Sequence, residues 1–223
     1  MSESFWKKIG LKRLKTAQIP AKADVEAQAD FLAEKLQPKI EEARTGKREL
    51  LFVDASHFIL SAFLGYLWSF VRIFVKSPSG RQRYNVLGAF NAMSHEIFTV
   101  TNDAYINANS IIALMKLLLV SYAGSAITLV MDNARYQRCK LVMEFAKGHG
   151  IELLFLPPYS PNLNLIERLW KYVKKKCLYN KYYADFSSFK SGIDDCIFNI
   201  DKKHKVEIDS LMTLKFQTLE NAS

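Results

Sequence analysis

The chain has 223 residues, of which 49% are hydrophobic and 24% are charged. These values fit one globular domain and argue against a wholly disordered chain. Lys and Arg number 31 against 22 Asp and Glu, a formal net charge of +9, which favours a polyanionic partner such as nucleic acid. The alternative is a soluble protein that is merely basic. The three cysteines have no C-x-x-C spacing, so they indicate neither a disulfide framework nor a zinc site and predict a reducing, cytoplasmic compartment.

An uncharged run of 17 residues, 55–71, raises the question of a membrane span. Its length is at the lower limit for crossing a bilayer, about 17–25 residues. Three serines, a histidine and Gly65 interrupt the run, and two strands joined around Gly65 explain it better. The N-terminus lacks the apolar core of a signal peptide. We therefore expect no membrane partner.

The predicted elements begin with a basic segment, residues 1–20, followed by a helix over 22–45 that Pro38 could divide in two. Strands are predicted at 50–54, 66–75, 84–92, 96–101, 126–132 and 151–155. Further helices are predicted from a cap at Asn109 to Gly124, over 133–150 and 165–177, and across much of 184–216. Because strands come first and then alternate with helices, the order predicts an α/β sandwich with a mixed sheet.

Asp54 and Asp132 each follow an apolar strand segment, LLFVD and AITLVMD. Open α/β sheets bind ligands in the crevice outside the C-terminal ends of their strands. Either aspartate by itself could simply begin a loop, but the shared context favours a functional pair. His57 could face the same site or pack elsewhere, and Asn133 could orient a ligand or, as we prefer, cap the next helix.

Glu167 lies in the predicted helix over 165–177, about 100° around the helical wheel from Ile166. This position borders the buried stripe of the helix and allows the carboxylate to lean toward the sheet edge. Two ordinary interpretations compete with a catalytic one. Asn164 and Glu167 have the spacing of a capping box, and Glu167 with Lys171 has the spacing of a surface ion pair.

Three carboxylates at one point would repel one another without a bound cation. Mg²⁺ takes oxygen ligands, and two such ions about 3.5–4 Å apart suit phosphodiester cleavage. A set of three acids therefore makes chemical sense as a metal site.

The segments LLFVDASHF, LVMDNARYQ and LFLPPYSPNLNLIERLWKYVKKK resemble DDE transposases of the mariner superfamily, in its bacterial insertion-sequence branch. Thirty-four residues separate Asp132 from Glu167, the interval of that branch, and 77 separate Asp54 from Asp132. The resemblance covers roughly residues 15–216. It implies a ribonuclease H-like three-layer sandwich whose mixed central sheet is flanked by helices. It also implies that Asp54, Asp132 and Glu167 are the catalytic residues and hold a pair of Mg²⁺ or Mn²⁺ ions.

The activity that the resemblance implies is cleavage of DNA at the element ends, followed by joining of the freed 3′-hydroxyl to target DNA.

The chain departs from the pattern of this family in two places. Many relatives have Pro where this chain has Leu165, and they carry N-terminal helix-turn-helix modules of which only SFWKKIGLKRLK could be a remnant. We therefore expect residues 1–45 to be a tail and helix from the junction to such modules, and 46–223 to be the catalytic domain.

Such a domain is expected in the bacterial cytoplasm at the nucleoid, as a homodimer or with full-length transposase. Two alternatives remain. The chain could be a non-catalytic remnant that binds DNA or inhibits a transposase, or it could be a nuclease that only hydrolyses.

Four basic residues lie close to Glu167 in the sequence: Arg168, Lys171, Lys174 and Lys175. We predict that they contact DNA phosphates, Lys171 and Lys174 above all. The alternative for these four is a solvated helix face.

Overall fold

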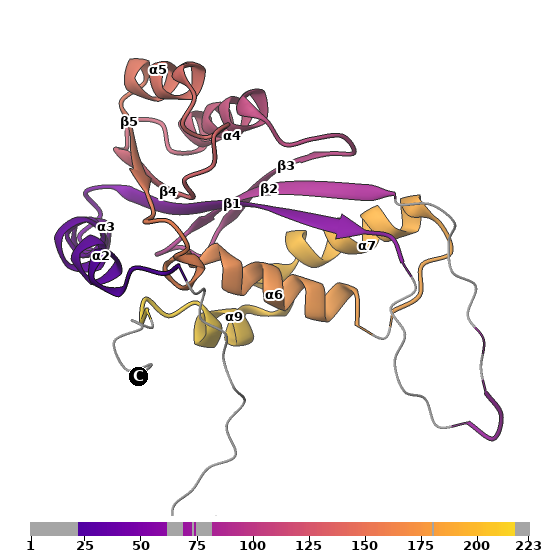
Figure 1. The fold of residues 1–223 in the computed structure, drawn as a ribbon. Coiled ribbons are helices and arrows are strands. Elements are labelled where there is room, and N and C mark those ends of the chain that lie inside the picture. Colours follow the sequence, from indigo (N-terminus) through magenta and orange to yellow (C-terminus); the bar gives the residue numbers. More distant parts are fainter. Residues whose placement is uncertain (1–21, 62–68, 73, 75–81, 180, 217–223) are drawn as a thin grey trace, which may run out of the picture.

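The computed structural model describes residues 22–61, 69–72, 74, 82–179 and 181–216. A five-stranded mixed sheet forms the middle layer (Figure 1), in the order β3-β2-β1-β4-β5. The strands are β1 (Glu49–Ile59), β2 (Arg83–Asn91), β3 (Ile97–Asn102), β4 (Ile127–Met131) and β5 (Ile151–Phe155). Strand β2 is antiparallel to β1 and β3, whereas β4 is parallel to β1 and β5. The mixed sheet is as predicted.

Helices cover both faces of the sheet (Figure 1). One face carries α4 (Ala108–Ser121) and α5 (Lys140–Gly148). The other carries α6 (Ile166–Cys177), α7 (Phe186–Phe198), α8 (Ile200–Lys203) and α9 (Lys205–Leu211). Each face has its own apolar core, which completes the predicted α/β sandwich of three layers.

Strand β1 is buried on both faces, and its side chains alternate between the two cores. Leu51 and Val53 belong to the core beneath α4 and α5. Phe52 and Phe58 belong to the core beneath α6. Asp54 is an even number of residues from Phe52 and Phe58 along β1, so its side chain lies on the same, α6 face of the sheet.

The N-terminal helices share the α6-side core. They are α2 (Val25–Asp30), a π-helical turn η1 (Phe31–Leu36) and α3 (Gln37–Arg44), which follow one another without a break. Pro38 lies at the start of α3, directly after the π-helical turn, and the helical run continues through it. Phe31, Leu36 and Ile40 are buried in the same cluster as the α6 residues. Residues 25–44 therefore pack as part of the same core as the sheet.

The strand predicted at 66–75 is wrong where it can be compared with the structure. Residues 69–72 and 74 are not in a strand, and the rest of that prediction lies outside the described residues. Strand β1 instead continues to Ile59, which pairs with Arg83 of β2. Aromatic and β-branched residues form strands only where a partner and a core are available, and Phe70 is fully exposed.

Two predicted helix starts also need correction. Helix α4 is capped by Asn107, which forms a capping box with Ser110, rather than by Asn109. Helix α5 begins only at Lys140, because residues 133–139 are irregular, with turns and bends over 135–139. Within the described residues, no helix has the length and apolar character needed to cross a membrane.

Candidate active site

The strand register brings Asp54 and Asp132 to neighbouring positions. The parallel ladder between β1 and β4 ends at the pair Val53 and Met131, and the two aspartates come next on each chain. Asp132 directly follows β4, as predicted. Asp54, however, is not at a strand end, because β1 continues beyond it and Asp54 pairs with Gly88 of β2. Only Asp132 therefore lies at the C-terminal end of a strand, the kind of place where α/β sheets bind ligands. Asp54 lies beside it, within the neighbouring strand β1.

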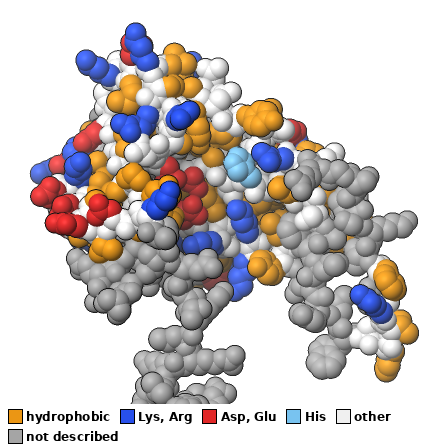
Figure 2. All heavy atoms as spheres, viewed as in Figure 1, with side chains coloured by type: hydrophobic (Ala, Val, Ile, Leu, Met, Phe, Trp, Pro, Cys, Tyr) orange, Lys and Arg blue, Asp and Glu red, His pale blue; other side chains and the backbone are white. Residues whose placement is uncertain are grey.

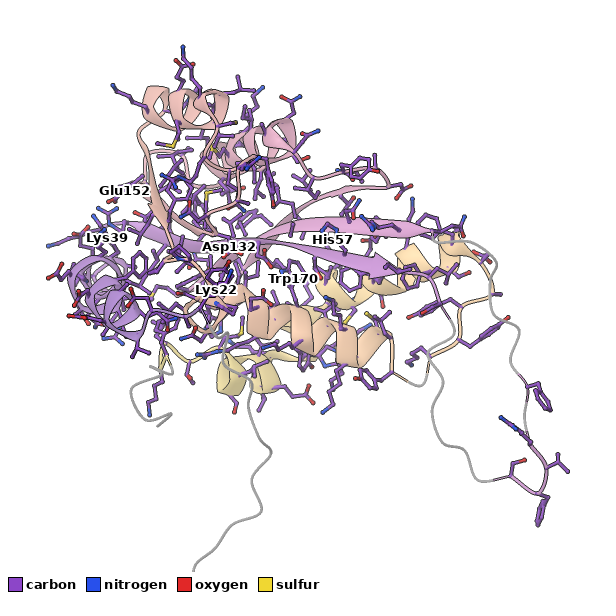
Figure 3. The ribbon with its side chains drawn as sticks, in the orientation of Figure 1. Lys22, Lys39, His57, Asp132, Glu152 and Trp170 are labelled. Carbon is purple, nitrogen blue, oxygen red and sulfur yellow. The ribbon has the colours of Figure 1, made fainter. Side chains whose placement is uncertain are left out.

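Helix α6 brings Glu167 over the α6 face of the sheet. Its Trp170 lies between the helix and the sheet (Figure 3), with the ring edge-on to Phe58 at a centroid distance of 6.4 Å. A Cβ added at Gly88 would lie 2.7 Å from Trp170 Cζ2 and 3.1 Å from Ile166 Cδ1. The helix thus packs against bare backbone opposite Asp54, and its first turn carries Glu167.

Asn164 is part of the site, and the sequence interpretation missed it. Its Nδ2 donates to Oδ1 of Asp132 at 3.2 Å and to the carbonyl oxygen of Val53 at 3.4 Å. The N-cap residue of α6 is Leu165, and it makes no side-chain capping hydrogen bond. The capping box with Glu167 is therefore wrong, because the Asn164 side chain is bound to the strands instead.

The three carboxyl groups have raised pKa values, through burial and, for Asp54 and Glu167, through the charges of other members of the set. Burial, then the charges of Glu167 and Asp132, raise the pKa of Asp54 from 3.8 to about 8. Burial also raises the pKa of Asp132, against a hydrogen bond that lowers it. The pKa of Glu167 is raised by burial and by Asp132, while Lys171 and Lys174 oppose this shift. Ionising all three carboxyl groups together is unfavourable in the metal-free protein.

The donor set fits a hard divalent cation, since it consists of carboxylates whose repulsion a cation would relieve. As the side chains stand, no group of three or more His, Cys, Asp or Glu among the described residues is arranged to hold a metal ion. Asp54, Asp132 and Glu167 would therefore have to move closer together to share an ion. The chemistry of the donors, rather than a preformed cage, supports metal binding.

Basic side chains border the acidic group. Figure 2 shows acidic side chains near the centre of one face, where Figure 3 labels Asp132, with Lys and Arg side chains around them. Lys171 and Lys175 are exposed and Lys174 is half-buried. Lys174 Nζ lies 5.7 Å from the centre of the Phe58 ring and acts electrostatically on Asp54. These three predicted phosphate contacts therefore lie on the helix that carries Glu167.

Arg168, the fourth predicted contact, is engaged within the protein. Its guanidinium donates to the carbonyl oxygens of Thr213 at 2.7 Å and Lys215 at 2.8 Å, and more weakly to Leu211 at 3.4 Å. It also lies 5.7 Å from the centre of the Phe216 ring. These contacts give Arg168 a structural role in holding the segment after α9.

The side chains of His57 and Asn133 bind groups other than the three carboxylates. His57 has the opposite parity to Asp54 along β1, and its Nδ1 lies 2.6 Å from Oδ1 of Asn85. Its role is thus hydrogen bonding within the sheet. Asn133 does not cap α5, whose N-cap is Cys139; its Oδ1 instead accepts from Nη1 of Arg138 at 2.6 Å.

Tyr136 is a second neighbour of the site that sequence reasoning missed. It lies in the turns that follow Asp132 and is half-buried. Burial, followed by the charges of Asp54 and Asp132, raises the pKa of its phenol. Tyr136 comes four residues after Asp132, in the DNARYQ segment. This closeness in the sequence is the feature that could have suggested Tyr136 as a neighbour of the site.

Residues 49–190, more than half of the chain, match the family model described as DDE superfamily endonuclease. The chain belongs to this family. Asp54, Asp132 and Glu167 all lie within the matched residues of this DDE endonuclease. A shorter similarity is found to the uncharacterized protein y4pE/y4sA of Sinorhizobium fredii (strain NBRC 101917 / NGR234), 30% identical over 63 residues. That alignment covers 28% of this chain and 44% of the relative.

Solved structures show the fold of this DDE endonuclease. The Mos1 transposase paired-end complex with left transposon end matches with a TM-score of 0.66 and 11% identity, over 95% of this chain and 66% of that chain. The catalytic domain of Mos1 mariner transposase matches with a TM-score of 0.56 and 12% identity, over 90% of this chain and 100% of that chain. The fold is therefore the ribonuclease H-like α/β fold that the resemblance implied. The chain spans about two thirds of the transposase in the paired-end complex.

Proposed function

We propose that this chain is the catalytic domain of a transposase that cleaves DNA at element ends and transfers the freed strand into target DNA. The observation that carries the proposal is that β1, the end of β4 and α6 bring Asp54, Asp132 and Glu167 near enough to interact electrostatically. Burial and the charges of the neighbouring carboxylates raise the pKa values of Asp54 and Glu167, and groups with perturbed pKa values gather at functional sites. Membership of the DDE endonuclease family supports phosphodiester chemistry.

We further propose that the three carboxylates hold a pair of Mg²⁺ or Mn²⁺ ions. Among the similar structures are Mos1 mariner paired-end complexes with Mn and with Mg. When bound, such ions would activate the attacking oxygen and stabilise the leaving oxygen of a phosphodiester. The protein contributes the carboxylate ligands, the burial that keeps bulk water from them, and their orientation by the sheet edge and α6.

DNA is the proposed substrate, and the charges around the site suit it. Lys171, Lys174 and Lys175 place three cations on the helix of Glu167, where they could contact the phosphates on either side of a bond at the carboxylates. We place the chain in the bacterial insertion-sequence branch, in the cytoplasm at the nucleoid. The interval of 34 residues between Asp132 and Glu167 is what favours this branch, and the location follows from the proposed branch. A homodimer, or association with full-length transposase, stays a prediction.

The direct test is incubation of the purified chain with supercoiled plasmid and Mn²⁺ or Mg²⁺. We expect nicked products that need the metal and disappear in Asp132→Asn. Asp103→Asn is a matched control, because Asp103 pairs with Lys190 on the surface and contacts none of the three acids. Nicking that persists unchanged in Asp132→Asn would overturn the assignment. Gel analysis of joined products separates a transposase from a nuclease that only hydrolyses.

A further inference from the structure

Asn164 occupies a buried position between the elements that carry the three acids. Its side chain is 1% exposed, and it precedes α6 by two residues. Both hydrogen-bond partners of its Nδ2 lie on the sheet, one on Asp132 and one on the backbone of β1. Asn164 therefore spans the gap between the end of β4 and the start of α6.

Asn164 makes one hydrogen bond to a carboxylate of the set and two to backbone atoms at or next to the other two acids. The Nδ2 atom donates to the Asp132 carboxylate at 3.2 Å. The same atom donates to the carbonyl oxygen of Val53, the residue before Asp54, at 3.4 Å. The backbone carbonyl oxygen of Asn164 accepts from the backbone N–H of Glu167 at 3.2 Å. One residue thus bonds to the side chain of Asp132, to the backbone beside Asp54 and to the backbone of Glu167.

The choice of an amide at this position has no explanation in packing. Its Oδ1 is buried and has no hydrogen-bond partner among the described residues, and an unpaired buried acceptor is unfavourable. An apolar side chain of similar volume would avoid that penalty. A polar side chain is therefore of use here for its N–H groups, which meet the Asp132 carboxylate and the β1 carbonyl.

We propose that Asn164 is a positioning residue, which orients Asp132 and fixes the start of α6 so that the three carboxylates can share metal ions. This inference rests on the proposed function, because it assigns a role toward the metal site. Partners that hold metal ligands in orientation typically contribute about 10–100-fold to metal affinity or activity. We therefore expect an effect of that size.

The first experiment is a titration of the full chain with Mn²⁺, read as the rise in melting temperature. Asn164→Ala is expected to raise the half-saturating Mn²⁺ concentration by about tenfold or more. Asn162→Ala is the matched control, since it alters the same loop and the same residue type but removes a hydrogen bond to Gln28. We expect this control to change the baseline melting temperature and leave the half-saturating concentration unchanged. Nicking by Asn164→Ala should also recover as Mn²⁺ is raised.

The outcomes distinguish the two proposals. If the unmodified chain shows neither a Mn²⁺-dependent shift nor nicking, the proposed function fails. If the unmodified chain responds to Mn²⁺ and folded Asn164→Ala responds at the same concentration, the positioning role fails and the proposed function stands. An equal change in half-saturation for Asn162→Ala would also overturn the inference, because the effect would then belong to the loop in general.

A second measurement needs neither metal nor activity. Asn164→Asp keeps the size of the side chain but places a carboxylate against Asp132, so it should destabilise the metal-free protein in urea unfolding. In an Asp132→Asn background the same change should be far less harmful, because the repulsion is gone and the new amide can donate. Such coupling identifies direct contact between the two side chains. Additive effects of the two substitutions would overturn the inference.

Discussion

Trp170 of α6 occupies the space that a side chain at Gly88 would need. The ring atoms Cζ2 and Cη2 would lie 2.7 and 2.8 Å from a Cβ at that position, and Gly88 is the antiparallel partner of Asp54. The absence of a side chain on β2 thus sets how closely the helix carrying Glu167 approaches the strand carrying Asp54. The relationship links core packing to the geometry of the candidate site.

Gly88→Ala is expected to destabilise the protein by about 1–3 kcal/mol, because overpacking a close contact forces side chains from their rotamers. Nicking activity should fall further than stability, since any outward shift of α6 moves Glu167. Urea unfolding and the plasmid assay measure the two effects. Gly148→Ala is the control, because a Cβ there would meet nothing within 4 Å and alanine favours the helix. Equal stability of the two variants would contradict the argument.

Asp54 should make the metal-free protein less stable as pH rises. The pKa of its carboxyl group is 3.8 ordinarily and about 8 in the fold, so the folded state holds a proton that the unfolded state releases. The resulting stability is fully present below about pH 4 and is lost as the pH rises through about 8. Asp54→Asn removes this loss. In EDTA, its melting temperature should exceed that of the unmodified chain increasingly between pH 5 and pH 8.

Added Mn²⁺ should reverse that order at pH 8. A ligand that binds only the folded state stabilises it, and the unmodified chain retains all three carboxylates. The melting temperature of the unmodified chain should therefore rise with Mn²⁺ while that of Asp54→Asn rises less. A pH-independent difference between the two proteins in EDTA would show that Asp54 is not strained by its neighbours.

Local patterns were enough to predict the two aspartates but not the residues that act across the fold. Asp54 and Asp132 follow apolar strand segments, a signal contained in five to seven neighbouring residues. Glu167 needed the family resemblance, because its own surroundings fit a helix cap. Asn164 was assigned to that cap, and its real partner Asp132 lies 32 positions away. Contacts of that range depend on how the sheet edge and α6 come together, which no local spacing reports.

The wrong strand and the misjudged role of Arg168 have the same origin. Residues 69–72 have the composition of a strand, but β-propensity depends on partners and packing, and Phe70 is exposed instead. Arg168 is of a residue type that usually lies on the surface, yet the segment after α9 folds back and accepts its hydrogen bonds. In both cases the tertiary partner, not the residue type, decides the outcome.

Lys171→Gln is expected to weaken DNA binding while leaving stability nearly unchanged. The side chain is exposed, and surface substitutions of this kind usually alter stability by about 0.5 kcal/mol or less. Loss of one phosphate contact should reduce the slope of log affinity against log salt by about 0.9. Fluorescence anisotropy with labelled duplex at several salt concentrations measures this slope. Lys147→Gln, at the end of α5 on the opposite face, is the control and should leave the slope unaltered.

Arg168→Gln should have the opposite effect, a loss of stability with little change in that salt slope. Glutamine cannot reproduce the paired donation to the carbonyls of Thr213 and Lys215 or the stacking over Phe216. Hydrogen bonds from a charged donor contribute about 1.5–3 kcal/mol, so we expect a reduction of about that size in urea unfolding. Proteolysis should then cleave the segment after α9 faster than in the Lys171→Gln protein. A reduced salt slope with unchanged unfolding would instead identify Arg168 as the phosphate contact that its position beside Glu167 predicted.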